Sequence, residues 1–205
     1  MAEDSFDKEL LNANLIGATS LEDLYQKESV LVGIKLSKII YQPIDGELDF
    51  NHLKAIHKYL FEDIYTFAGL DRYEAGIIAE FGKGSTLFTP YEKLPLVAKT
   101  LFTALQDEEY FKGQSKNEFI KSIAVFMNGL NILHPFREGN GRTQRVFMQY
   151  LAKHNGYELN FNDVNSKEMI LASIHGVKGD MLLMEKIFQK GMKQIEGTSK
   201  NPRYS

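Results

Sequence analysis

The spacing of apolar residues constrains the fold of this chain more than any other feature of its sequence. They recur at steps of three and four residues over much of its length, which places them on one face of successive helices. The first clear stripe comprises Leu53, Ile56, Leu60, Ile64 and Phe67. "TPYE" (Thr89–Glu92) and "SKNE" (Ser115–Glu118) predict capping boxes that open two further helices.

Three more helices are expected in the second half of the chain, over about 142–155, 166–175 and 180–195. The segment Tyr73–Pro90 breaks the helical pattern, because β-branched and aromatic residues flank "GKGS" there. Such a pattern predicts a β-hairpin. The expected fold class is therefore mostly α, a helical bundle with one short β-hairpin flap.

At 205 residues the chain is long enough for a substantial core, and we expect an N-terminal helical extension packed on that core (1–49), a main domain (50–196) and a flexible tail (197–205). The net charge of −3 argues against a protein that coats nucleic acid. The absence of cysteine excludes disulfides, thiolate zinc sites and cysteine nucleophiles. With no signal-peptide pattern and no run of roughly 18 apolar residues, we expect a cytoplasmic protein with no membrane partner.

The stretch "LHPFREGNGRTQR" (Leu133–Arg145) concentrates polar and glycine residues between two predicted helices. Pro135 disfavours helical geometry in the residue before it, so the first helix is expected to end near His134. Gly139, Asn140 and Gly141 tolerate positive φ angles, which point successive backbone N–H groups into one concavity. The next helix starts beside that concavity, and its N-terminus attracts anions.

Charged residues complete this anion site. Arg142 and Arg145 lie three residues apart and project from neighbouring positions of the second helix. Glu138 is one carboxylate beside the expected phosphate position, which is the usual protein contribution to a magnesium site. The pKa typical of histidine suits His134 to act as a general base near neutral pH. Together these residues predict magnesium-dependent chemistry on a phosphate ester or anhydride, with solvated surface residues around a glycine turn as the alternative.

The stretch "HPFREGNGRTQR" resembles the Fic-family motif, His-Pro-Phe-x-Asp/Glu-Gly-Asn-Gly-Arg-x-x-Arg, at every defining position. "FAGLDR" (Phe67–Arg72) is similar to the family segment that leads into a flap, and the predicted hairpin falls where the family has one. The resemblance covers about Phe50 to Ile195. It implies a Fic-type helical bundle with the β-hairpin flap next to the active-site loop.

The resemblance also implies an activity. Fic proteins mostly act as protein adenylyltransferases, which transfer AMP from ATP to a hydroxyl side chain of a target protein and release pyrophosphate. By this resemblance, His134 would deprotonate the hydroxyl, and Glu138 would hold Mg²⁺ across the α- and β-phosphates. Amides of Gly139–Gly141 would bind these phosphates, and Arg142 and Arg145 would neutralise charge on the β- and γ-phosphates.

Other family traits refine this expectation. The related Doc kinase toxins have lysine at the second motif glycine, whereas this chain has Gly141, which favours nucleotide transfer over phosphate transfer. Phe136 is expected to anchor the loop in the core. The flap residues Gly84, Ser85, Thr86, Leu87 and Phe88 would bind an extended target segment by β-augmentation. The hydroxyl could belong to tyrosine, serine or threonine.

Many Fic proteins carry an inhibitory helix with the pattern Ser/Thr-x-x-x-Glu-Gly/Asn, which in one subgroup is the C-terminal helix. "MKQIEG" (Met192–Gly197) falls at the end of the last predicted helix and retains the glutamate, although Met192 replaces Ser or Thr. We therefore expect Glu196 to pair with Arg145 and to inhibit the enzyme. A separate antitoxin chain is the alternative source of inhibition.

The sequence is also compatible with two alternative functions. The motif could serve a non-enzymatic regulator that only binds a nucleotide, although a sensor has no need of a base such as His134. A Fic enzyme could also use another donor, such as UTP or CDP-choline. The family often forms homo-oligomers, and no feature of the sequence settles that state.

Overall fold

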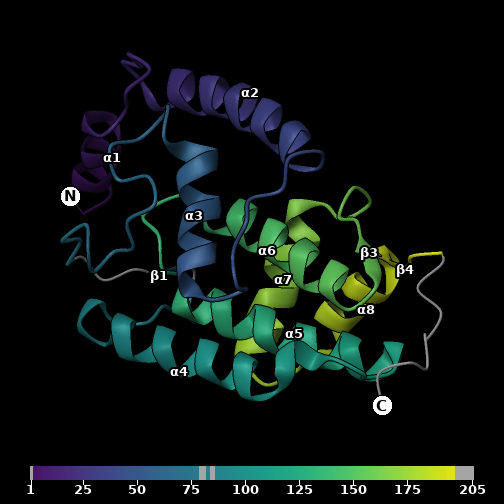
Figure 1. The fold of residues 1–205 in the computed structure, drawn as a ribbon. Helices are drawn as coiled ribbons and strands as arrows, with labels where there is room; N and C mark the ends of the chain where they lie inside the picture. Colours follow the sequence, from purple (N-terminus) through teal and green to yellow (C-terminus); the bar gives the residue numbers. More distant parts are fainter. Residues whose placement is uncertain (1, 79–81, 84–85, 197–205) are drawn as a thin grey trace.

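The computed structural model describes residues 2–78, 82–83 and 86–196. Helices dominate this part of the chain, which confirms the mostly α fold class (Figure 1). The helices are α1 (Ala2–Asn12), α2 (Leu21–Ile39), α3 (Phe50–Phe61), α4 (Leu94–Asp107), α5 (Lys116–Leu133), α6 (Asn140–His154), α7 (Ser166–Val177) and α8 (Leu182–Gly191). Two antiparallel pairs of short strands accompany them, β1 (Gly82–Lys83) with β2 (Thr86–Leu87) and β3 (Tyr157–Leu159) with β4 (Met192–Gln194).

Helix α5 lies at the centre of the bundle and contacts α4, α6, α7 and α8. Its buried side chains occupy successive turns, as the apolar stripe predicts. Phe126 of α5 meets Phe102 of α4 edge-on at 5.6 Å between ring centroids, and Phe147 of α6 lies 6.0 Å from Phe126. This aromatic core fixes α5 against α6. The loop that joins these two helices, residues 134–139, is therefore held from both sides.

One of the two predicted capping boxes is confirmed. Ser115 accepts a hydrogen bond from the Glu118 N–H, and the Glu118 carboxylate accepts one from the Ser115 N–H. The other prediction, at Thr89–Glu92, is wrong. The Thr89 N–H and hydroxyl both donate to the carbonyl of Ile132 instead, because the last carbonyls of α5 lack partners within their own helix. A short 3₁₀ turn (Tyr91–Lys93) then leads into α4.

The predicted hairpin is confirmed in the described part of the flap. Strand β1 pairs with β2 in the register Gly82 to Leu87 and Lys83 to Thr86. Gly84 and Ser85, both predicted to bind a target, lie outside the described residues. Beyond β2, Thr89 is bonded to the end of α5, so the flap leads directly to the α5–α6 loop.

The prediction that the last helix continues to about Ile195 is wrong. Helix α8 ends at Gly191, and β4 follows, because its backbone pairs with β3. Gly191 approaches Asn160 so closely that a Cβ would lie 2.2 Å from the Asn160 carbonyl oxygen, and its own carbonyl accepts from the Asn160 N–H. Pairing with a distant segment thus overrides the local helical pattern.

This correction also moves Glu196. The Ile195 N–H donates to the carbonyl of Gly156, just beyond the C-terminal end of α6. Arg145 lies near the other end of that helix, and at 1.5 Å per residue the stretch from Arg145 to Gly156 spans roughly 16 Å. Glu196 is exposed and follows a strand, so the predicted pair between Glu196 and Arg145 is wrong. Gly197 lies outside the described residues.

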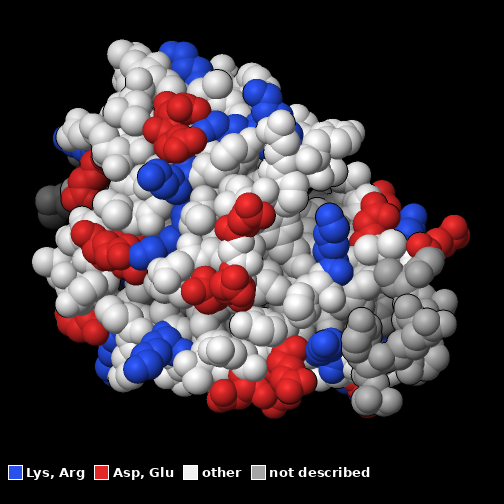
Figure 2. Space-filling view, in the orientation of Figure 1, with Lys and Arg blue, Asp and Glu red and all other residues white. Residues whose placement is uncertain are grey.

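Helices α1 and α2 precede the main bundle, and α2 packs on α3 (Figure 1). The boundary between an extension and a main domain near residue 49 stays a prediction. Within the described residues, no helix combines the length and apolar composition that crossing a membrane requires. On the face shown in Figure 2, acidic and basic side chains are interspersed rather than gathered into one band.

Candidate active site

The loop between α5 and α6 is shaped by left-handed residues at both ends. His134 (φ 43°) caps α5, which ends at Leu133 close to where Pro135 predicts, and Gly139 (φ 81°) precedes α6. Between them Phe136 is fully buried, which agrees with its expected role as an anchor. The Asn140 side chain clamps Phe136, since its amide donates to the Phe136 carbonyl at 2.7 Å and its oxygen accepts from the Phe136 N–H at 2.9 Å. The Asn140 side chain therefore stiffens the loop, and only its backbone can serve an anion.

His57 of α3 packs against the loop and supports it, a role that sequence reasoning missed. Its ring stacks on Phe136 with centroids 3.9 Å apart and planes at 4°. Nδ1 accepts from the Gly69 N–H, so the proton is assigned to Nε2, which lies 3.0 Å from the Glu138 carbonyl oxygen and donates to it. Burial is the main cause that lowers the pKa of His57 to about 4, with nearby Arg142 acting in the same direction. His57 is therefore neutral at pH 7.

This pKa predicts a loss of stability in acid. An unfolded histidine titrates near 6.5, so between pH 6.5 and 4 the unfolded chain binds a proton that the folded chain excludes. The free energy of unfolding should fall by roughly 3 kcal/mol over this window from His57 alone. Urea unfolding at pH 7 and pH 4 should show that His57→Gln removes this part of the loss. The variant of exposed His154, His154→Gln, should keep it, and equal pH dependence in both variants would contradict the prediction.

His134 is held in place by two neighbours outside its own helix, Phe88 and Arg72. Its ring stacks on Phe88, just after β2, with centroids 3.7 Å apart and planes at 3°. Its carbonyl accepts from Arg72 Nε at 2.8 Å. The same guanidinium donates through Nη2 to the carbonyls of Thr89 (2.8 Å) and Leu133 (3.2 Å). Arg72 is fully buried and joins the base of the flap to the end of α5.

The N-terminus of α6 has the backbone arrangement expected for the predicted anion cradle, with one difference. Of the three residues expected to tolerate positive φ, only Gly139 adopts it, while Asn140 and Gly141 already belong to α6. The first N–H groups of the helix have no carbonyl partner within it, so they remain available to a ligand. Gly141 is exposed, and a Cβ there would meet only Arg145 Nη1 at 3.5 Å.

The two motif glycines should therefore respond differently to alanine. In Gly139→Ala, the Cβ would lie 2.3 Å from two ring atoms of fully buried Phe61 and would sit at positive φ, so we expect a loss of roughly 2–5 kcal/mol in stability. Gly141→Ala should keep or slightly raise stability, because alanine favours helix. Its methyl group should nevertheless weaken binding of an ATP analogue. Thermal unfolding and analogue titration of both variants measure this, and a wild-type melting curve for Gly139→Ala would contradict the steric argument.

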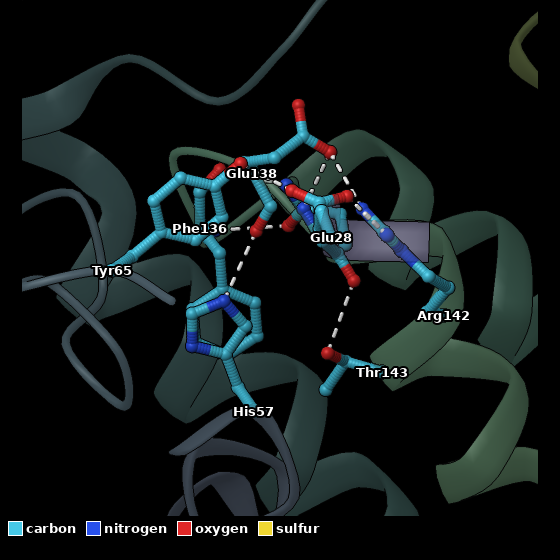
Figure 3. A network of polar contacts seen from close by, with 9 residues as sticks. Glu28, His57, Tyr65, Phe136, Glu138, Arg142 and Thr143 are labelled. Carbon is cyan, nitrogen blue, oxygen red and sulfur yellow. Dashed lines mark hydrogen bonds and ion pairs between the residues drawn. The ribbon is translucent and has the colours of Figure 1, made fainter. Parts of the chain in front are cut away.

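The two predicted arginines differ in their partners. Arg142 Nη2 donates to Glu138 Oε1 at 3.1 Å, and Nη1 pairs with Glu28 of α2, which sequence reasoning also missed (Figure 3). Arg145 has no carboxylate within ion-pair distance among the residues that the structure describes. Burial and the neighbouring charge of Arg142 lower the pKa of Arg145, although a guanidinium remains charged. Of the two predicted arginines, Arg145 is thus the one whose charge is not paired with a carboxylate of the described residues and can bind an external anion.

Glu138 fits a magnesium ion that takes most of its ligands from a nucleotide. Its Oε1 accepts from the Gly139 N–H at 2.7 Å and from Arg142. The side chain is about one-third exposed. No cluster of three or more acidic or histidine side chains that could hold a metal is found in the described ranges. A single carboxylate beside an anion site suits Mg²⁺, which keeps several waters and binds substrate phosphates.

A cavity of about 390 Å³ opens beside His134. Its polar wall includes His134, Gly141 and Arg145, and its apolar wall comes from α7 and from Phe88, just after β2. The apolar lining consists of Phe88, Met169, Ile170, Ile174 and Val177. Its volume and its mixed lining are those of a small-ligand site. A second cavity of about 360 Å³, between α2 and α7, is also lined by Arg142 and Arg145.

The structure thus places His134, Gly141, Arg145 and Phe88 on one cavity. Glu138 and Arg142 bond to each other beside it, at the loop and the N-terminus of α6. The structure leaves Glu196 at the other end of α6. The contribution of α7 to the cavity was not predicted, because nothing local in 166–177 distinguishes a ligand-facing helix from a core helix.

Comparison with known proteins identifies similar chains. A sequence model of the Fic/DOC family matches residues 47–152. Protein adenylyltransferase VbhT of Bartonella schoenbuchensis is 34% identical over 182 residues, a match that covers 89% of this chain and 37% of VbhT. The chain therefore spans little more than a third of the length of that relative.

Two solved structures share the fold. The N-terminal Fic domain of a VirB-translocated Bep effector protein from Bartonella quintana, with bound ADP, has a TM-score of 0.83 and 27% identity, and covers 89% of this chain and 91% of its own. BepC of Bartonella tribocorum, with bound AMPPNP, has a TM-score of 0.82 and 26% identity, and covers 89% of this chain and 92% of its own.

Proposed function

The chain belongs to the Fic/DOC family, and on this premise we propose that it is a protein adenylyltransferase that transfers AMP from ATP to a hydroxyl of a target protein. One observation carries the proposal. A single cavity of about 390 Å³ is lined by His134, Gly141 and Arg145, so a base, a helix N-terminus and a cation face one space. A relative named protein adenylyltransferase and two relatives solved with ADP or AMPPNP support the same activity.

The proposed reaction moves one proton and exchanges one bond at phosphorus. His134 accepts the proton of the target hydroxyl, whose oxygen forms a bond to the α-phosphorus while the bond to the bridging oxygen of pyrophosphate breaks. The α6 N–H groups and Arg145 stabilise the charge on the phosphates. Glu138 would hold Mg²⁺, which when bound neutralises phosphate charge. The Phe88 stack and the Arg72 bond keep His134 oriented.

The position of Gly141 favours transfer of the nucleotide. The absence of a side chain leaves the cavity open beside His134, which lets the α-phosphorus rather than the γ-phosphorus approach the base. Incubation of the protein and a lysate with Mg²⁺ should transfer label from α-labelled ATP and none from γ-labelled ATP. Label from the γ-position alone would identify a kinase, and binding without any transfer would identify a nucleotide sensor. Competition by UTP or CDP-choline tests the other donors.

The flap is proposed to align the target. Its strand β2 leads through Phe88 to the catalytic histidine, so a target segment paired with residues 84–88 would bring its hydroxyl to His134.

Thr86→Pro should therefore reduce target labelling at least tenfold, because proline removes a backbone donor from the strand. Binding of AMPPNP should stay within about twofold, since the cradle on α6 is not altered. Gel-based labelling and calorimetry measure the two quantities. Undiminished labelling would exclude the docking role of the strand.

The target is proposed to present a tyrosine, serine or threonine hydroxyl, in a cytoplasmic setting where ATP is abundant. Mass spectrometry of labelled lysate proteins identifies the modified residue.

Homo-oligomers and a separate antitoxin chain are further proposed partners, which size-exclusion chromatography and co-purification test. The proposed source of inhibition is this antitoxin chain rather than a C-terminal helix, because residues 192–194 form strand β4.

A further inference from the structure

Glu28 of α2 is a buried carboxylate that reaches the candidate active site from outside the motif. It is 3% exposed, and its two oxygens have different partners. Oε1 pairs with Arg142 Nη1, and Oε2 accepts from the hydroxyl of Tyr65 (Figure 3). Burial and the bond to Glu28 both raise the pKa of Tyr65, so its hydroxyl remains a donor. A buried carboxylate is tolerated only when it is paired in this way.

Arg142 is consequently shared between two acids. Nη1 faces Glu28, Nη2 faces Glu138, and the guanidinium carbon lies 4.9 Å from the centroid of the Phe61 ring. A guanidinium and a single carboxylate otherwise favour a two-bond, bidentate pair. Glu28 occupies one edge of the guanidinium and so limits Glu138 to one bond.

We propose that Glu28, oriented by Tyr65, is a positioning residue that holds Arg142 back from Glu138 and so keeps the Glu138 carboxylate available to the metal. This inference rests on the proposed role of Glu138 as the magnesium ligand. It makes α2, which precedes the matched family segment 47–152, part of the nucleotide site. Without Glu28, Arg142 can form both bonds to Glu138, and Mg²⁺ must then displace a stronger partner.

Binding of AMPPNP with and without Mg²⁺ tests the inference without turnover. For the wild-type chain, Mg²⁺ should tighten binding. The dissociation constant without Mg²⁺ divided by the dissociation constant with Mg²⁺, called the Mg²⁺ ratio, measures the contribution of the metal. Glu28→Gln should bind AMPPNP without metal at least as tightly as wild type, since one negative charge near the phosphates is gone. The Mg²⁺ ratio should fall about tenfold. Glu22→Gln, the same change at an exposed position of α2, should match wild type.

A double-mutant cycle separates this role from others. If Glu28 acts through Glu138, Glu28→Gln should not change the Mg²⁺ ratio further in a Glu138→Gln background. An unchanged Mg²⁺ ratio in Glu28→Gln would overturn the inference. This includes the case in which AMPPNP binds more tightly by the same factor with and without metal, as expected if Glu28 only repelled the nucleotide. If Glu28→Gln does not fold, Tyr65→Phe should lower the ratio in the same direction, and a wild-type ratio in that variant would overturn it. Failure of wild type to bind AMPPNP at all would reject the proposed function itself.

Discussion

Replacing His134 with alanine should lower the rate of AMP transfer by about two to four orders of magnitude, the usual contribution of a general base. No other side chain that lines the cavity can accept a proton near neutral pH in the part of the chain that the structure describes. The nucleotide contacts proposed for α6 and Arg145 remain in this variant. Affinity for AMPPNP should therefore stay within about threefold of wild type.

The backbone at His134 requires a matched control. Its φ of 43° is in the left-handed region, where alanine is disfavoured by roughly 1–2 kcal/mol and asparagine is tolerated better. His134→Asn should thus keep the loop conformation but lose the base, and it should be as inactive as His134→Ala. Initial rates with α-labelled ATP and calorimetric titration with AMPPNP measure both variants. Substantial transfer by the asparagine variant would show that another group accepts the proton.

The sequence predicted the active-site loop well because its determinants are local. Pro135 ends α5 at Leu133, Gly139 takes the left-handed turn, and the motif arginines follow on the next helix. The apolar stripes likewise predicted α3 to α5, since burial of one face follows directly from the spacing. Such features are encoded within about ten residues of one another.

The supporting residues could not be predicted because their partners are distant in sequence. Glu28 forms an ion pair with Arg142, and His57 bonds to the carbonyl of Glu138. Neither Glu28 in α2 nor His57 in α3 interrupts the helical pattern of its own helix. A buried charged or histidine residue on an apolar face was the available signal, but it does not identify a partner. The error at Glu196 has the same origin, since a helical pattern in 192–195 was outweighed by pairing with β3. Local periodicity carries no information about such pairings.

Arg72 illustrates how a residue outside the motif can control both stability and the site. Its guanidinium donates to the carbonyls of Leu133, His134 and Thr89. The backbone N–H of Arg72 donates to the Pro135 carbonyl at 2.7 Å. The carbonyls of Leu133 and His134 stand at the C-terminal end of α5, where a cation also complements the helix dipole. Arg72 therefore acts as a buried cap that joins α5 to the flap.

Arg72→Met should lower the free energy of unfolding by about 4 kcal/mol, because the shape is retained while buried carbonyls lose charged donors. Arg72→Lys should lose less, since a single ammonium can still reach one or two of these carbonyls. Lys99→Met, at an exposed position of α4, should change stability by less than about 0.5 kcal/mol. Urea unfolding at pH 7 measures all three variants.

The same change should separate stability from catalysis when the temperature is chosen so that Arg72→Met remains folded. The loss of the bond from Arg72 Nε to the His134 carbonyl frees the backbone that orients the base. The rate of transfer should then fall at least tenfold while AMPPNP binding to α6 is largely kept. A variant that is destabilised but fully active while folded would show that the Phe88 stack alone is sufficient to orient His134.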